Sequence, residues 1–208
     1  MFRALSTTCS GVRRILVRCL IVALATMAPV WVPSLRAQSA PAYASEAVRA
    51  LFLINFLGFT DWPADTLPQN TPYVIGVAGS RALEEELLAL AEKRLVRDRR
   101  IRVVRVKNSR DLAGCHLLYV SPFFASGDEN SPTAGELLPL VRRQSVLTVS
   151  SSSTFLQEGG IVNLVAGDQG RLHFEISTNN AKEAGLVLSS RLLALARIVN
   201  PSPADGGR

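Results

Sequence analysis

Residues 47–63 form a dense apolar run, AVRALFLINFLGFTDWP, around which the rest of the domain is expected to pack. Ser45 is suited to begin a helix and Gly58 to end it, so the run predicts a helix of about three to four turns. Because residues 50–57 are apolar at nearly every position, this helix must be covered on most sides. It is shorter than the about 20 residues that span a bilayer. We predict a buried core helix, with a partner or membrane surface as the alternative.

The N-terminus has the pattern of a secretory signal peptide. Residues 1–18 carry four arginines and no acidic residue, and residues 19–32 are almost continuously apolar. Cleavage sites with small residues follow at residues 35–37 and 42–44. We therefore predict that residues 1–44 are a signal peptide and short leader, cleaved between about 37 and 44, and that the protein is exported.

Removal of this segment changes the charge of the protein. Residues 1–37 hold five of the 23 basic residues and none of the 17 acidic ones, so the exported chain has 18 basic against 17 acidic residues and a net charge of about +1. This balance gives no support for nucleic-acid binding. The remaining length fits one domain, predicted at residues 45–200, with a disordered tail at residues 201–208.

The rest of the domain alternates predicted strands and helices after an expected loop at residues 60–72. Short apolar runs predict strands at residues 73–78, 101–106, 116–121 and 146–149. Ser80 is expected to cap a helix at residues 81–93, and a capping box of Thr133 and Glu136 opens a helix to about Arg143.

The C-terminal third predicts a hairpin and a helix. Two alternating runs, residues 161–165 and 171–176, are joined by a Gly-containing turn, and residues 180–199 show helical spacing. We predict an α/β fold: a mostly parallel sheet with helices on both faces, an antiparallel C-terminal hairpin and a long closing helix.

Few residues suggest catalysis. No Ser/His/Asp set, pair of carboxylates or metal-binding cluster stands out, so we predict no catalytic residue, no metal and no cofactor. His173 and Glu175 share a strand face and could hold a metal or move a proton, but a solvated hairpin face explains them better.

The cysteines allow no intrachain disulfide. Cys9 and Cys19 lie in the predicted signal peptide, which leaves Cys115 alone in the exported chain. We interpret Cys115 as a small buried residue. His116 follows it on a predicted strand and faces the opposite side, so the two cannot act together as nucleophile and base.

Residues 93–110 are strongly basic. They hold half of the positive charge of the exported chain, on Lys93, Arg94, Arg97, Arg99, Arg100, Arg102, Arg105, Lys107 and Arg110. This cluster could face anionic lipid head groups or an acidic partner. It could equally be a solvated sheet edge whose charges prevent strand-to-strand aggregation.

Taken together, several motifs in a fixed order resemble the YfiR family over about residues 45–199. They are ALFLINFLGFTDWP at residues 50–63, IGVAG at 75–79, CHLLYVS at 115–121, VLTVS at 146–150, Phe155 before GGIVNLV at 159–165, and AGLVLSSRLL at 184–193. The resemblance implies a periplasmic regulator, not an enzyme, that holds back a membrane-bound diguanylate cyclase through its periplasmic portion. It also implies relief by an outer-membrane lipoprotein and a homodimer. Disulfides used by some members cannot form here within one chain, so redox control is not expected.

Two functions therefore remain, with different sites. An inhibitor would bind its partner through Phe155, Leu156 and Ile161, which lie in or beside a Ser-rich, Gly-bounded turn expected at the surface. A small-ligand sensor acting on a different membrane partner would use the carboxyl ends of the strands, near Ser80, Ser121 and Phe123. An exposed apolar patch on the turn would favour the inhibitor, and a polar cavity at the strand ends would favour the sensor.

Overall fold

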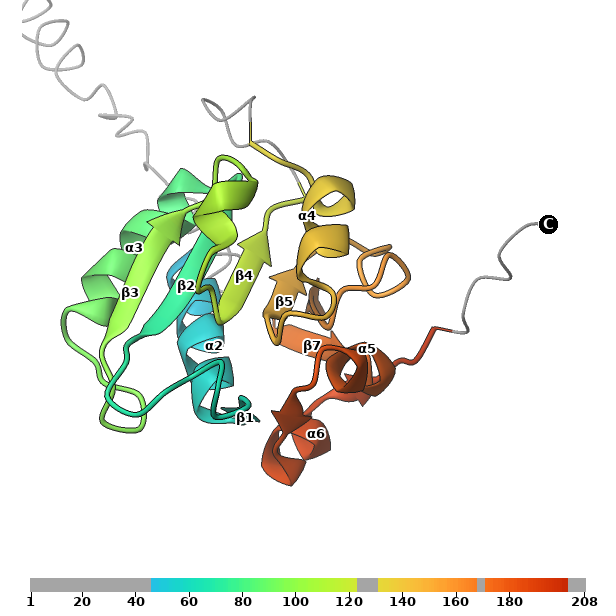
Figure 1. Cartoon of the computed structure of the whole chain (residues 1–208). Coiled ribbons are helices and arrows are strands. Elements are labelled where there is room, and N and C mark those ends of the chain that lie inside the picture. The colour runs from blue at the N-terminus through green and yellow to red at the C-terminus, as the bar shows by residue number, and fades with distance from the viewer. Residues whose placement is uncertain (1–45, 123–130, 168–170, 202–208) are drawn as a thin grey trace, which may run out of the picture. The chain divides into compact units, whose positions relative to one another are not determined.

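The computed structural model describes residues 46–122, 131–167 and 171–201 (Figure 1). The predicted signal peptide, the proposed cap Ser45 and most of the predicted tail lie outside these residues. The strands are β1 (Thr60–Asp61), β2 (Tyr73–Ala78), β3 (Ile101–Arg105), β4 (Leu117–Val120), β5 (Leu147–Ser150), β6 (Val162–Ala166), β7 (Leu172–Ile176), β8 (Val187–Leu188) and β9 (Arg197–Ile198). The helices are α2 (Glu46–Gly58), α3 (Arg81–Ala91), η2 (Ser109–Leu112), α4 (Ala134–Val141), α5 (Thr178–Glu183) and α6 (Ser190–Leu195).

Seven strands form one mixed sheet in the order β3-β2-β4-β5-β6-β7-β9. Strands β3, β2, β4, β5 and β6 run parallel to one another, β7 is antiparallel to β6, and β9 is parallel to β7. The predicted α/β fold with a C-terminal hairpin is therefore confirmed. No helix in the part of the chain that the structure describes has the length and apolarity needed to cross a membrane.

Helices cover both faces of the sheet because the strand residues alternate between two apolar clusters. Tyr73, Ile75 and Val77 of β2 pack with α2 and α3 on one face. On the other face Ala78 belongs to a second cluster that includes Leu112 of η2 and residues of α4. Strand β2 is buried along its whole length, as expected for a central parallel strand.

Helix α2 is the core helix that the sequence predicted. Its buried residues are Ala50, Leu53, Ile54, Phe56 and Leu57, and Asn55 is its one fully exposed residue. The rings of Phe52 and Phe56 lie 6.0 and 5.2 Å from that of Phe174 on β7. The helix therefore ties the parallel half of the sheet to the hairpin.

The predicted long closing helix is wrong. Helix α5 ends at Glu183, where Gly185 takes a left-handed φ of +72° and turns the chain. Strand β8 then pairs with β1 in a separate two-stranded sheet, so the predicted loop at residues 60–72 also begins with a short strand. Ser189 caps α6 by accepting a hydrogen bond from the Leu192 amide, and β9 joins the main sheet.

Candidate functional site

A cavity of about 250 Å³ lies at the carboxyl ends of β2, β4 and β5. The chain leaves β2 toward β3 on one side, and it leaves β4 toward β5 on the other, with α3 and α4 on opposite faces. Such a reversal of direction opens a crevice outside the strand ends, where ligands of open α/β sheets bind. The lining residues are Gly79, Ser121, Pro122, Ser131, Pro132, Thr133, Ala134, Gly135, Ser150, Ser152 and Glu158.

Hydroxyl groups dominate the chemistry of this cavity. Ser150 already donates a hydrogen bond to the Val120 carbonyl at 2.7 Å, and Thr133 donates to Glu136 at 2.9 Å in the predicted capping box. The hydrogen bond from the Thr133 amide, and after it the bond from the Thr133 hydroxyl, lower the pKa of Glu136, so this carboxyl stays ionised and holds the start of α4. The cavity is therefore preorganised, and its size suits one small polar molecule.

The three residues that we expected to face a ligand have different positions. Ser121 lines the cavity. Ser80 does not, because it is nearly buried and its hydroxyl accepts a hydrogen bond from the Leu83 amide at 3.3 Å to cap α3. Phe123 lies outside the described residues. A ligand-binding role for these residues stays a prediction.

Phe155, Leu156 and Ile161 do not form the exposed apolar patch that would favour the inhibitor, and their role in partner binding stays a prediction. Phe155 is 0% exposed and Leu156 is 4% exposed, and both pack with Leu138 of α4. Ile161 is buried in the main core. In this conformation none of the three presents a side chain to a partner.

Two features keep the Phe155 and Leu156 side chains buried, although Ser153, Thr154, Gln157 and Glu158 of the same turn are exposed. The side-chain amide (Nδ2) of Asn180 on α5 donates hydrogen bonds to the carbonyls of Leu156 at 3.0 Å and Gly160 at 2.6 Å. Gly160 also lets the Phe155 ring lie against the backbone, because a Cβ at that position would overlap the ring. The turn is therefore held down on the hairpin by a residue of another element.

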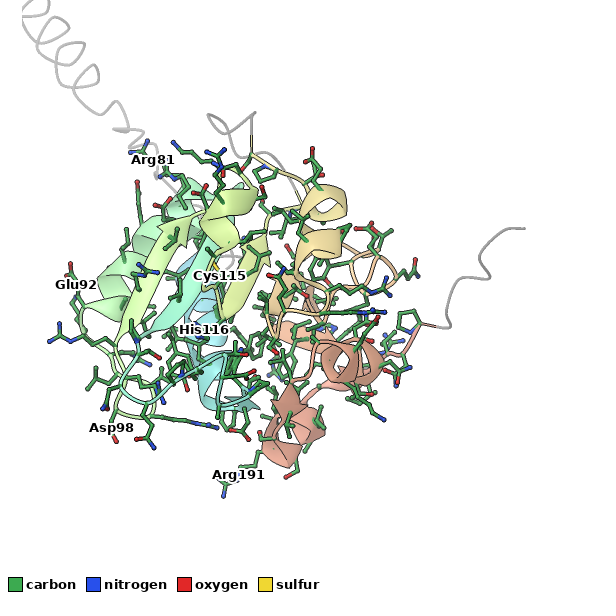
Figure 2. All side chains as sticks on the ribbon, viewed as in Figure 1. Arg81, Glu92, Asp98, Cys115, His116 and Arg191 are labelled. Atoms are coloured by element: carbon green, nitrogen blue, oxygen red, sulfur yellow. The ribbon has the colours of Figure 1, made fainter. Side chains whose placement is uncertain are left out.

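Cys115 is buried, as predicted, and lies next to His116 just before β4 (Figure 2). Burial raises the pKa of its thiol to about 11, and the partial opposing effect of Arg102 does not prevent this. The thiol is therefore protonated at neutral pH and is a poor nucleophile.

Both ring nitrogens of His116 contact backbone groups. Its Nδ1 accepts a hydrogen bond from the Val74 amide at 3.1 Å, and its Nε2 lies 3.3 Å from the Thr66 carbonyl. A neutral ring with its proton on Nε2 satisfies both contacts. Burial lowers the pKa of His116, which also favours this neutral form.

His173 and Glu175 lie on one face of β7, as the sequence predicted, but Glu175 makes contacts that stabilise the sheet. Glu175 pairs with Arg197 of β9 at 3.3 Å and accepts a hydrogen bond from Asn163 at 3.4 Å. The described ranges contain no group of three or more His, Cys, Asp or Glu residues that could hold a metal ion.

A family model described as YfiR/HmsC-like matches residues 46–197. No curated protein matches the chain. Among solved structures, a conserved domain protein from Vibrio cholerae is 13% identical with a TM-score of 0.48, over 74% of this chain and 60% of that one. An ABC domain in complex with L-Trp from Streptococcus pneumonia is 15% identical with a TM-score of 0.42, over 72% and 62%. The chain thus spans less than two thirds of the length of either structure.

Proposed function

This chain belongs to the YfiR/HmsC-like family, and on that premise we propose that it is a periplasmic regulator that inhibits a membrane-anchored diguanylate cyclase through the periplasmic region of the cyclase. The family match carries this proposal, because it extends over nearly the whole described domain. The signal-peptide pattern supports it independently, since an inhibitor of this kind must be exported.

Inhibition by binding fits the chemistry of the domain better than catalysis. Cys115 is held as a protonated thiol, and both ring nitrogens of His116 contact backbone groups. Nucleophilic catalysis needs an activated nucleophile beside a base, and neither residue is placed for that role. We further propose a homodimer that is relieved by an outer-membrane lipoprotein.

The test uses the organism that carries the gene. Deletion should raise cyclic di-GMP and surface attachment, and the full chain supplied in trans should restore both. A form that lacks residues 1–37 should fail to restore them although it accumulates, because it remains in the cytoplasm. Unchanged cyclic di-GMP after deletion would refute the regulatory role, and full rescue by the leaderless form would refute action in the periplasm.

A second candidate function is favoured by the cavity at the strand ends. A small-ligand sensor needs a preformed pocket with converging polar groups, and this crevice is lined by hydroxyls and by Glu158. A ligand of this site should raise the unfolding temperature of the protein. Ser152→Leu, which fills the cavity, should abolish the shift, and Ser153→Leu on the exposed side of the same turn should keep it. A shift that survives Ser152→Leu would place the ligand elsewhere.

A further inference from the structure

Strand β3 is an open edge of the seven-stranded sheet, where β2 is its only neighbour among the described strands. The Arg100 carbonyl accepts a hydrogen bond from the Tyr73 amide, and the Val106 amide donates to Val77. Because backbone groups alternate in direction along a strand, the backbones of Ile101 and Val103 point away from β2. Their amides and carbonyls are therefore available to a further strand.

Helix α3 lies beside β3 (Figure 1). A groove of about 540 Å³ runs along this edge, between β3 and the C-terminal half of α3. Leu88, Ala91, Glu92 and Leu95 line it from the helix side, and residues 100–103 line it from the strand side. Leu88 is 45% exposed and Leu95 is 61% exposed, so two large apolar side chains that line one groove are open to solvent.

The two sides of the edge differ in chemistry. Ile101 packs into the core cluster shared with α3, and Arg105 pairs with Glu84 of α3 at 2.6 Å, so these alternate residues face the helix. The side chain of Arg102 consequently points to the opposite face of the sheet. In the described ranges neither Arg100 nor Arg102 makes an ion pair. The helix side of the edge therefore offers the exposed Leu88 and Leu95 beside an ion pair, and the other side is basic.

We propose that the β3 edge is a docking site for an extended, acidic segment of a partner protein, in which apolar and acidic residues alternate. The segment adds to β3 as one further strand and bonds the backbones of Ile101 and Val103. Its apolar side chains lie in the groove at Leu88 and Leu95, and its carboxylates face Arg102 and the neighbouring Arg100. This goes beyond the proposed function, because it holds whichever membrane protein is regulated.

A second copy of the chain is a poorer occupant. An antiparallel pair of two β3 strands centred on Val103 would place the Arg102 side chains of the two copies diagonally next to each other, and like charges at such positions are unfavourable. Glu92 is the one acidic residue that lines the groove, and it lies on the helix side, where the apolar residues of the proposed segment would pack.

The test uses the exported protein and a synthetic peptide of about seven residues that alternates Glu and Val. We expect the peptide to bind at low salt and to slow amide hydrogen exchange at Ile101 and Val103. A peptide with Lys in place of every Glu should not bind. Absence of binding by the Glu peptide, or binding without protection of these two amides, would overturn the proposal.

Matched variants separate the groove from general electrostatics. Arg100→Glu with Arg102→Glu should weaken peptide binding about tenfold or more, whereas Lys107→Glu with Arg110→Glu, in the same basic segment but outside the groove, should change it less than about twofold. Leu88→Ser should also weaken binding, and Leu140→Ser, at an equally exposed leucine of α4, should not.

Equal losses in the two charge pairs would show that bulk charge alone drives binding. The contrary result is a protein that fails to bind the peptide and forms a dimer in sedimentation velocity that Val103→Pro disrupts. This result would assign the edge to a second copy of the chain and refute the acidic partner.

Discussion

The burial of Phe155 can be tested by a double-mutant cycle with Gly160. The ring lies so close to the Gly160 backbone that a Cβ there would overlap three of its carbons. Gly160 does not have a left-handed φ, so alanine is compatible with its backbone. Gly160→Ala should therefore destabilise the protein only through the Phe155 ring, by about 1–3 kcal/mol, as other overpacking substitutions do.

Phe155→Ala removes a fully buried aromatic ring and leaves a cavity beside Leu138 and Leu156. Such substitutions cost about 3–5 kcal/mol. In this background the clash at Gly160 is absent, and Gly160→Ala should be neutral or should stabilise by about 0.4–1 kcal/mol through the lower entropy of the unfolded chain. The expected coupling free energy is therefore about 2 kcal/mol.

The assay is equilibrium urea unfolding of the four proteins, followed by circular dichroism, with the condition that the denaturant slope stays constant. Equal effects of Gly160→Ala with and without Phe155 would show that the ring does not cover this glycine. If Phe155→Ala lowers the free energy of unfolding by less than about 1 kcal/mol, the ring is exposed. The turn would then again be a candidate partner-binding surface.

Three further predictions concern the core. Phe52→Asp should lose about 2–4 kcal/mol of stability, because it places a charge between Phe56 and Phe174. Asn55→Asp, on the exposed side of α2, should unfold near the wild-type temperature. Comparable stability of the two variants would contradict a buried α2. Since burial lowers the pKa of His116, the unfolded chain binds more protons below about pH 6.5, and stability should fall as the pH decreases from there. His116→Gln should remove this part of the slope in thermal melts between about pH 7.5 and 5.5, and His173→Gln should keep it. Cys115 should react with a thiol reagent only after unfolding, and the protein should run as a monomer on non-reducing gels, so that a disulfide-linked dimer would show an exposed thiol.

Local sequence patterns correctly predicted two kinds of element: those held by contacts between residues close in the sequence, and strands that are buried along their whole length. The strand at residues 73–78 has the predicted bounds, because it is buried along its whole length and Gly79 with the helix cap Ser80 follows it directly. The capping box at Thr133 also formed as predicted, with Glu136 accepting hydrogen bonds from the amide and hydroxyl of Thr133 at 2.7 and 2.9 Å. Both features depend on residues that are adjacent or three apart.

The closing helix shows how helical spacing misleads. Ala181, Ala184 and Leu192 are buried as a helix would bury them, but two short helices on either side of β8 achieve the same result. Gly185 and Ser189 were the signals against a continuous helix, because glycine favours a helix end and serine favours a helix start. The pairing of β8 with β1 is a contact between distant residues, and no local pattern indicates it.

The turn at Phe155 lies at the surface as expected, but its two large apolar side chains are tucked under it, and this redirects the search for a partner site. The apolar side chains of a surface turn can fold under it when another element satisfies the carbonyls they cover, and here the side-chain amide of Asn180 does so from α5. That contact spans 24 residues at Leu156 and has no local sequence pattern. Large apolar side chains are instead exposed at Leu88 and Leu95, beside the basic strand that the sequence marked as a sheet edge. Because recognition needs accessible backbone, apolar area and charge in one place, substitutions that separate partner binding from folding should concentrate at β3, whereas those in the turn should change both together.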